Sequence, residues 1–81
     1  MSDKYVLISV CNREILTEVF TTHQEAAKMM HNEMRSMGGI EEDVFDGGWG
    51  QEFEGDYFGF DQWGGYVNLD KYDLDWRIVA L

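Results

Sequence analysis

Three shortages in this chain of 81 residues each exclude a class of function. The single cysteine, Cys11, allows neither an internal disulfide nor a cysteine-based zinc site. Only six basic residues stand against sixteen acidic ones, and a net charge of −10 is repelled by nucleic acid and by anionic membranes. No apolar run approaches the ~18–20 residues that span a bilayer, and no secretory signal pattern is present. We therefore expect a cytoplasmic protein that binds neither nucleic acid nor membranes directly.

Motifs for catalysis are also lacking. The chain has no glycine-rich phosphate loop with a lysine and no Ser-His-Asp spacing. We expect Cys11 to be a small apolar residue of a strand, and His23 and His31 to be surface residues of a helix. The sequence therefore predicts neither an enzyme nor a cofactor.

Residues 43–54 partly match a calcium-binding EF-hand loop. An acid, a glycine and an acid occupy its first, sixth and twelfth positions. The third and fifth positions are Phe45 and Gly47, which offer no side-chain oxygen. Because too few ligands remain, we predict no metal site in this segment.

The first twenty residues predict a hairpin. Residues 5–11 and 14–20 are rich in β-branched and apolar residues, which indicates two strands joined by a turn at Asn12-Arg13. The pattern leaves open which face of the second strand is buried, Ile15-Thr17-Val19 or Leu16-Glu18-Phe20. We favour the first, because a glutamate is the residue least easily buried.

A helix is predicted from residue 22 to about residue 37. Thr22 and Glu25 fit a capping box at its start, and Gly38 is a natural stop at its end. Alanines and methionines recur at helical spacing on one side and predict the face that packs on a sheet. These residues are Ala26, Ala27, Met30, Met34 and Met37.

The second half predicts further strands. Residues 40–55 are rich in glycine and are expected to form a loop with at most one helical turn. Strands are expected at 56–60, 65–69 and 75–81, with turns at 61–64 and 70–74. The sequence therefore predicts one α+β domain over residues 1–81, in which one main helix packs on a small antiparallel sheet of strand-strand-helix-strand-strand order.

Residues 41–75, here called the acidic stretch, carry the whole net charge. Eleven of the sixteen carboxylates lie in it beside one base, Lys71, while the rest of the chain holds five acids and five bases. Nine aromatic residues and seven of the nine glycines are interleaved with these acids. We expect Tyr66 and Trp76 to lie in the core. The pattern leaves open whether the aromatic residues at 49, 53 and 63 cover the sheet or stay exposed.

A partner, if one binds, is expected to meet the acidic stretch. Its carboxylates would attract basic groups, and tryptophans are frequent anchors of protein interfaces. The predicted partner-binding residues are Asp46, Trp49, Glu52, Glu54, Asp56, Asp61 and Trp63. The alternative is that the acidity serves only solubility.

The chain resembles small acidic inhibitors of phages and bacterial mobile elements, of the anti-CRISPR and anti-restriction type. The similarity covers length, acidity, the single cysteine, the interleaving in residues 41–75, and the run from Tyr5 through Thr22-His23-Gln24-Glu25-Ala26 to Asp75-Trp76-Arg77-Ile78. Some of these inhibitors place carboxylates where nucleic acid places phosphates. The resemblance implies a basic nucleic-acid-binding partner, such as a CRISPR effector nuclease, and it transfers no residue's role.

Three functions are compatible with the sequence. The most concrete is a non-enzymatic inhibitor that binds the basic nucleic-acid groove of a bacterial defence nuclease. The second is an interaction or accessory domain of a mobile element without nucleic-acid mimicry. The third is a ligand- or metal-binding module or a small enzyme.

Overall fold

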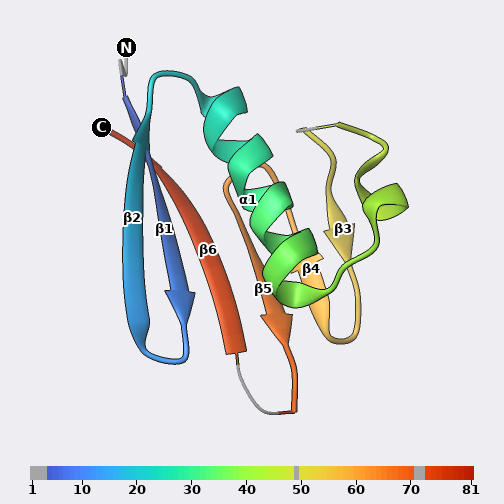
Figure 1. Ribbon diagram of the computed structural model, residues 1–81. Coiled ribbons are helices and arrows are strands. Elements are labelled where there is room, and N and C mark those ends of the chain that lie inside the picture. Colours follow the sequence, from blue (N-terminus) through green and yellow to red (C-terminus); the bar gives the residue numbers. More distant parts are fainter. Residues whose placement is uncertain (1–3, 49, 71–72) are drawn as a thin grey trace.

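The computed structural model describes residues 4–48, 50–70 and 73–81, and it shows one helix lying on a six-stranded antiparallel sheet (Figure 1). The strand order across the sheet is β2-β1-β6-β5-β4-β3. The predicted α+β fold is confirmed, with a larger sheet than expected. The elements are β1 (Tyr5–Cys11), β2 (Glu14–Phe20), α1 (His23–Gly38), the 3-10 helix η1 (Glu42–Phe45), β3 (Phe53–Glu54), β4 (Phe58–Phe60), β5 (Gly64–Asn68) and β6 (Asp73–Ala80).

The β1–β2 hairpin forms because its two turn residues accept positive φ. Asn12 and Arg13 have φ of 48° and 78°, as a two-residue hairpin turn requires. The turn places Cys11 opposite Glu14 and fixes the register of all seven pairs. The chain then returns at its C-terminal end to pair β6 with the other side of β1, so β1 is an inner strand.

Helix α1 begins after the predicted cap, Thr22, and ends one residue later than predicted, since Gly38 is its last residue. Thr22 Oγ1 accepts a hydrogen bond from the Glu25 N–H at 3.1 Å. Gly39 closes the helix in the left-handed region, with φ of 70°. Of the predicted sheet-facing residues, the alanines and Met30 and Met34 are fully buried, while Met37 packs at the margin of the core.

The core lies between α1 and the strands β1, β6, β5 and β4. Its buried apolar residues are Leu7, Ala26, Ala27, Met30, Met34, Ile40, Phe58, Phe60, Val67, Leu74, Trp76 and Ile78. One polar contact crosses it: Glu33 Oε1 accepts hydrogen bonds from Ser9 Oγ at 2.9 Å and from Trp76 Nε1 at 3.0 Å. A helix carboxylate therefore joins α1 to the neighbouring inner strands β1 and β6.

Two expectations about buried faces are wrong. The register of β2 on β1 places Ile15, Thr17 and Val19 on the face away from α1, and Ile15 is 66% exposed. Of the opposite set, only Phe20 packs against the core, because α1 lies over the middle of the sheet and not over its β2 edge. Leu74, expected in a turn, is fully buried within β6.

The face of the sheet opposite α1 carries no helix among residues 4–48, 50–70 and 73–81 (Figure 1). Over β2 and β1 it is apolar, with Ile15, Val19, Val6 and Ile8. Over β5, β4 and β3 it is lined by glycines, acids and aromatic rings. No helix in the described parts of the chain is long and apolar enough to cross a membrane.

Candidate partner-binding surface

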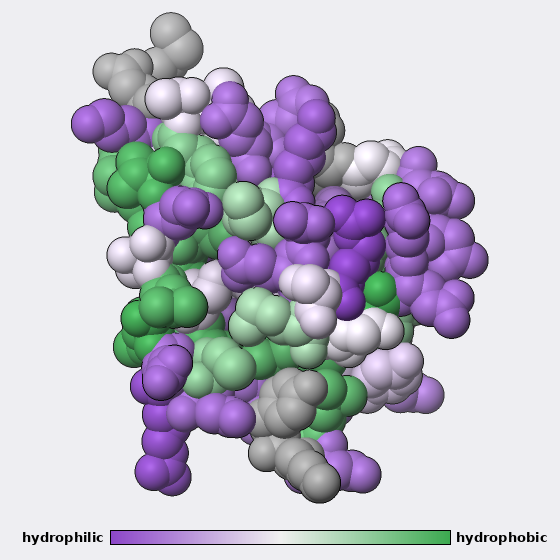
Figure 2. All heavy atoms as spheres, in the orientation of Figure 1, coloured by the Kyte–Doolittle hydropathy of each residue, from purple (hydrophilic) through white to green (hydrophobic). Residues whose placement is uncertain are grey.

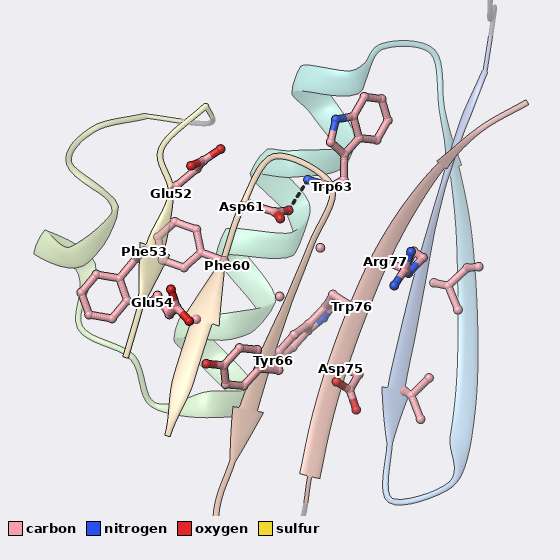
Figure 3. Close-up of a pocket in the computed structure, with 15 residues that line it drawn as sticks. Glu52, Phe53, Glu54, Phe60, Asp61, Trp63, Tyr66, Asp75, Trp76 and Arg77 are labelled. Carbon is pink, nitrogen blue, oxygen red and sulfur yellow. Dashed lines mark hydrogen bonds between the residues drawn. The ribbon is translucent and has the colours of Figure 1, made fainter. Parts of the chain in front are cut away.

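A groove of about 910 Å³ runs across the open face over β1, β6, β5, β4 and β3, with Ile8 and Val10 at its β1 end (Figure 3). Four carboxylates, five aromatic side chains and a single arginine lie along it. The charged residues are Glu52, Glu54, Asp61, Asp75 and Arg77, and the aromatic ones are Phe53, Phe60, Trp63, Tyr66 and Trp76. We call this the acidic groove.

Glycines make room for the acidic groove. A Cβ at Gly64 would lie 2.7 Å from the Trp76 carbonyl oxygen, so the two strands approach too closely for any side chain there. A Cβ at Gly59 would lie 2.9 Å from the ring of Tyr66, which crosses this glycine and donates a hydrogen bond to the Gly55 carbonyl at 3.1 Å. The missing side chains leave a hollow floor.

The prediction for Tyr66 is wrong, and the question that the sequence left open for Phe53 has a mixed answer. Tyr66 was expected in the core, but it alternates with buried Val67 and therefore lies on the open face. Phe53 is 39% exposed and stacks on Phe58, with ring centroids 4.8 Å apart. Trp76, by contrast, is 4% exposed, as predicted.

Trp63 is held in place while almost half of it stays exposed. Its ring stacks on that of His23, with centroids 4.2 Å apart and planes 28° apart, and 47% of Trp63 is accessible. A ring nitrogen of His23 is hydrogen-bonded to the Gln62 carbonyl, and Asp61 Oδ1 accepts the Trp63 N–H at 2.7 Å. His23 was expected to be exposed, but the β4–β5 turn folds over it.

The structure brings together four of the seven predicted partner-binding residues. Glu52, Glu54, Asp61 and Trp63 all line the acidic groove. Asp56 is exposed in the β3–β4 turn but lines no hollow that we identify in the described residues. Asp46 lines a different hollow, on the helix side, and the prediction for Trp49 falls outside the described residues.

Among the residues of the acidic groove that sequence reasoning did not assign to a partner are Tyr66, Asp75 and Arg77. The signal was present, because Asp75 and Arg77 alternate with buried Trp76 and must share a face. The alternation alone did not show that these two residues belong to the acidic groove. The pairing of β6 with β5 shows it, because it places Tyr66 beside Asp75 and Gly64 beside Arg77.

A second hollow, of about 600 Å³, lies beside α1 and η1. His31 lines it but is only 5% exposed, so the expectation of a surface histidine is wrong. Its ring packs against Phe45 and Phe60, with centroids 4.7 and 5.0 Å away, and its Nε2 has no hydrogen-bond partner among the described residues. Burial, and then the nearby Arg35 charge, lower the pKa of His31.

The carboxylates of the acidic stretch are exposed. All eleven of its carboxylate residues lie at the surface. Within residues 4–48, 50–70 and 73–81, one ion pair forms, between Arg35 and Glu42 at 3.6 Å. Figure 2 shows hydrophilic side chains gathered at its right margin, over the side of the molecule that carries η1. In the same described ranges, no group of three or more His, Cys, Asp or Glu side chains could hold a metal ion.

No protein-family model, no curated protein and no solved structure matches this chain.

Proposed function

We propose that the protein is a non-enzymatic cytoplasmic inhibitor that binds the basic nucleic-acid groove of a bacterial defence nuclease, with a CRISPR effector as the first target to test. The acidic groove and the carboxylates around it would occupy positions that phosphates occupy in the nucleic-acid complex. The protein would contact no nucleic acid itself, because its charge has the same sign.

One observation carries the proposal: eleven exposed carboxylates occupy one stretch of a folded chain, and a single described ion pair neutralises one of them. Such an arrangement destabilises the free protein by self-repulsion, and a Lys- and Arg-rich partner relieves that cost on binding. A disordered acidic tail would achieve solubility without this cost. Here the acids lie on strands, on η1 and on the short segments between these elements, so the fold gives them a defined spacing.

The acidic groove adds groups that recognise arginine and lysine side chains. Trp63 and Tyr66 offer aromatic surface on which a guanidinium can stack, and Glu54 and Asp61 supply carboxylates within the same hollow. A basic loop of the target could therefore enter the acidic groove while the outer acids steer its approach. Rim charges of this kind mainly raise the association rate, and buried anchors slow dissociation.

The test is competition between this protein and nucleic acid for a purified CRISPR effector or restriction enzyme. A labelled DNA or guide RNA is bound to the target, and this protein is added over a series of salt concentrations. We expect displacement of the nucleic acid at low salt and weaker displacement at high salt, because surface charges are screened over about 8–10 Å.

Matched variants separate the groove from general acidity. Glu54→Lys and Asp61→Lys lie in the acidic groove, whereas Glu25→Lys changes the charge equally on the exposed side of α1. Weak binding of the groove variants beside normal binding of Glu25→Lys supports the proposal. Equal binding of all variants, or simultaneous binding with saturating nucleic acid, would show instead an interaction domain without mimicry.

A further inference from the structure

The two edges of the sheet are protected very differently. At one edge, β3 is two residues long and sits among exposed acids, which discourages pairing with another strand. At the other edge, β2 is seven residues long and pairs with β1 without a bulge. Ile15, Leu16 and Val19 on β2 are 66%, 60% and 58% exposed. Long, flat and apolar edge strands are templates for adding a further strand.

The outward backbone groups of β2 come from Ile15, Thr17 and Val19. A two-residue turn makes Cys11 and Glu14 a hydrogen-bonded pair, so the odd residues of β1 bond to the even residues of β2. The bonds between the ends of β1 and β6 support this assignment, because they use even-numbered residues on the β1 side. The Asn12 N–H donates to Asp73 O at 3.5 Å, and Lys4 O accepts from the Leu81 N–H at 3.0 Å. The odd residues of β2 therefore direct their N–H and C=O groups away from the sheet.

This edge is complementary to itself. If two copies of β2 pair antiparallel about Thr17, each Ile15 lies opposite Val19 of the second copy, and Thr17 lies opposite Thr17. Each of these pairs has both partners on the open face, and each supplies an N–H and a C=O for the partner strand. We propose that β2 is a dimerisation strand, which joins two copies of this chain into one continuous twelve-stranded sheet.

The distribution of charge favours a second copy at this edge over the basic partner proposed above. In residues 4–20, Lys4 and Arg13 balance Glu14 and Glu18, so the hairpin side of the molecule is neutral. The acidic groove reaches β1 only through the apolar Ile8 and Val10, and its charged residues lie from β6 to β3, towards the other edge of the strand order. Figure 2 shows hydrophobic side chains gathered at its left margin, over β1 and β2. Two copies can therefore meet through β2 without bringing their acidic stretches together, and each acidic groove stays free.

Sedimentation equilibrium measures the dimer directly. The wild-type chain should shift from its 9.4 kDa monomer towards twice that mass between low and high micromolar concentration. Amide hydrogen exchange locates the interface. The N–H groups of Ile15, Thr17 and Val19 should become protected from exchange as the protein concentration rises. Added salt should leave this association unchanged or strengthen it, since it buries apolar groups and no ion pair.

Three variants define the interface. Thr17→Pro removes an outward N–H without breaking the β1–β2 ladder, and Ile15→Lys places a charge on the edge. Each should raise the dimer dissociation constant by about tenfold or more, with far-UV circular dichroism showing that the monomer is folded. Val79→Lys is the matched control, because Val79 is exposed on the same face but belongs to the inner strand β6.

The inference is independent of the proposed inhibitor function, since Asp61→Lys should alter target binding and leave the dimer intact. A monomer at high micromolar concentration, with fast exchange of all three amides, would overturn it. Loss of the dimer in Val79→Lys but not in Thr17→Pro would also overturn it, in favour of face-to-face packing of the open faces.

Discussion

Glu33 should contribute strongly to stability although it belongs to the acidic residues of the helix surface. One of its carboxylate oxygens accepts from both Ser9 Oγ and Trp76 Nε1, at 2.9 and 3.0 Å. Both donor residues are buried, at 6% and 4% exposure. Glu33→Ala would leave these two donors without an acceptor.

The expected loss follows from the two donors. A buried donor without an acceptor costs about 1–3 kcal/mol, and the serine hydroxyl can rotate towards another acceptor, so we expect about 2–3 kcal/mol in total. A domain of this length has roughly 4–12 kcal/mol of stability, so the loss is a large fraction of it. It corresponds to a decrease in Tm of about 10–20 °C.

Urea unfolding followed by tryptophan fluorescence measures the loss, because Trp76 reports on the contact itself. Glu33→Gln is the matched variant: its amide oxygen can still accept, so the cost should be about 1 kcal/mol or less. Gln24→Ala, at an exposed helix position, controls for helix propensity. If Glu33→Ala unfolds within about 0.5 kcal/mol of the wild type, the proposed role of this contact is wrong.

The remaining predictions concern the groove floor, His31 and Trp63. Gly64→Ala should lower stability by more than about 2 kcal/mol in urea unfolding, because its Cβ would lie 2.7 Å from a backbone oxygen, while Gly50→Ala, with its nearest neighbour at 3.8 Å, should change little. The pKa of His31 is lowered by burial and by Arg35, so the unfolded chain binds the proton more tightly than the folded chain. The contribution of neutral His31 to the free energy of unfolding should therefore be fully present above the ordinary histidine pKa of about 6.5 and should fall as the pH drops below it. Unfolding at pH 7.5 and 5.5 measures this decrease, which His31→Phe should abolish; an unchanged decrease in that variant would assign it to other groups. Trp63→Ala should weaken target binding by about 2 kcal/mol in calorimetry if the exposed ring is an anchor, and an unchanged affinity would remove Trp63 from the interface.

Local signals in the sequence predicted most of the elements. Thr22 caps the start of the helix as predicted, and the cap at Gly39 lies one residue beyond the predicted stop at Gly38. Capping chemistry acts within a few residues and is therefore visible in the chain itself. The hairpin turn at Asn12-Arg13 and the alternation of Trp76 and Ile78 are local in the same way. The charge of the acidic stretch also needed no structure, because acids in such number are difficult to bury anywhere.

Tertiary structure alone decided which faces are covered. The sequence could not show that α1 lies over β1, β6 and β5, which leaves Ile15 and Val19 exposed and encloses His31 between Phe45 and Phe60. These outcomes depend on the strand order and on how far one helix of sixteen residues can reach across six strands.

The residues of the acidic groove were likewise predicted in part from the sequence and found in part only in the structure. The sequence identified Glu52, Glu54, Asp61 and Trp63 by composition, but their neighbours Asp75 and Arg77 come from the last strand. Pairing of β6 with β5 brings these segments together, and close backbone approach at Gly64 sets the floor between them. Composition determined which residue types are available for binding, and long-range strand pairing determined which of them share one hollow, because register between distant strands is fixed only when the whole sheet forms.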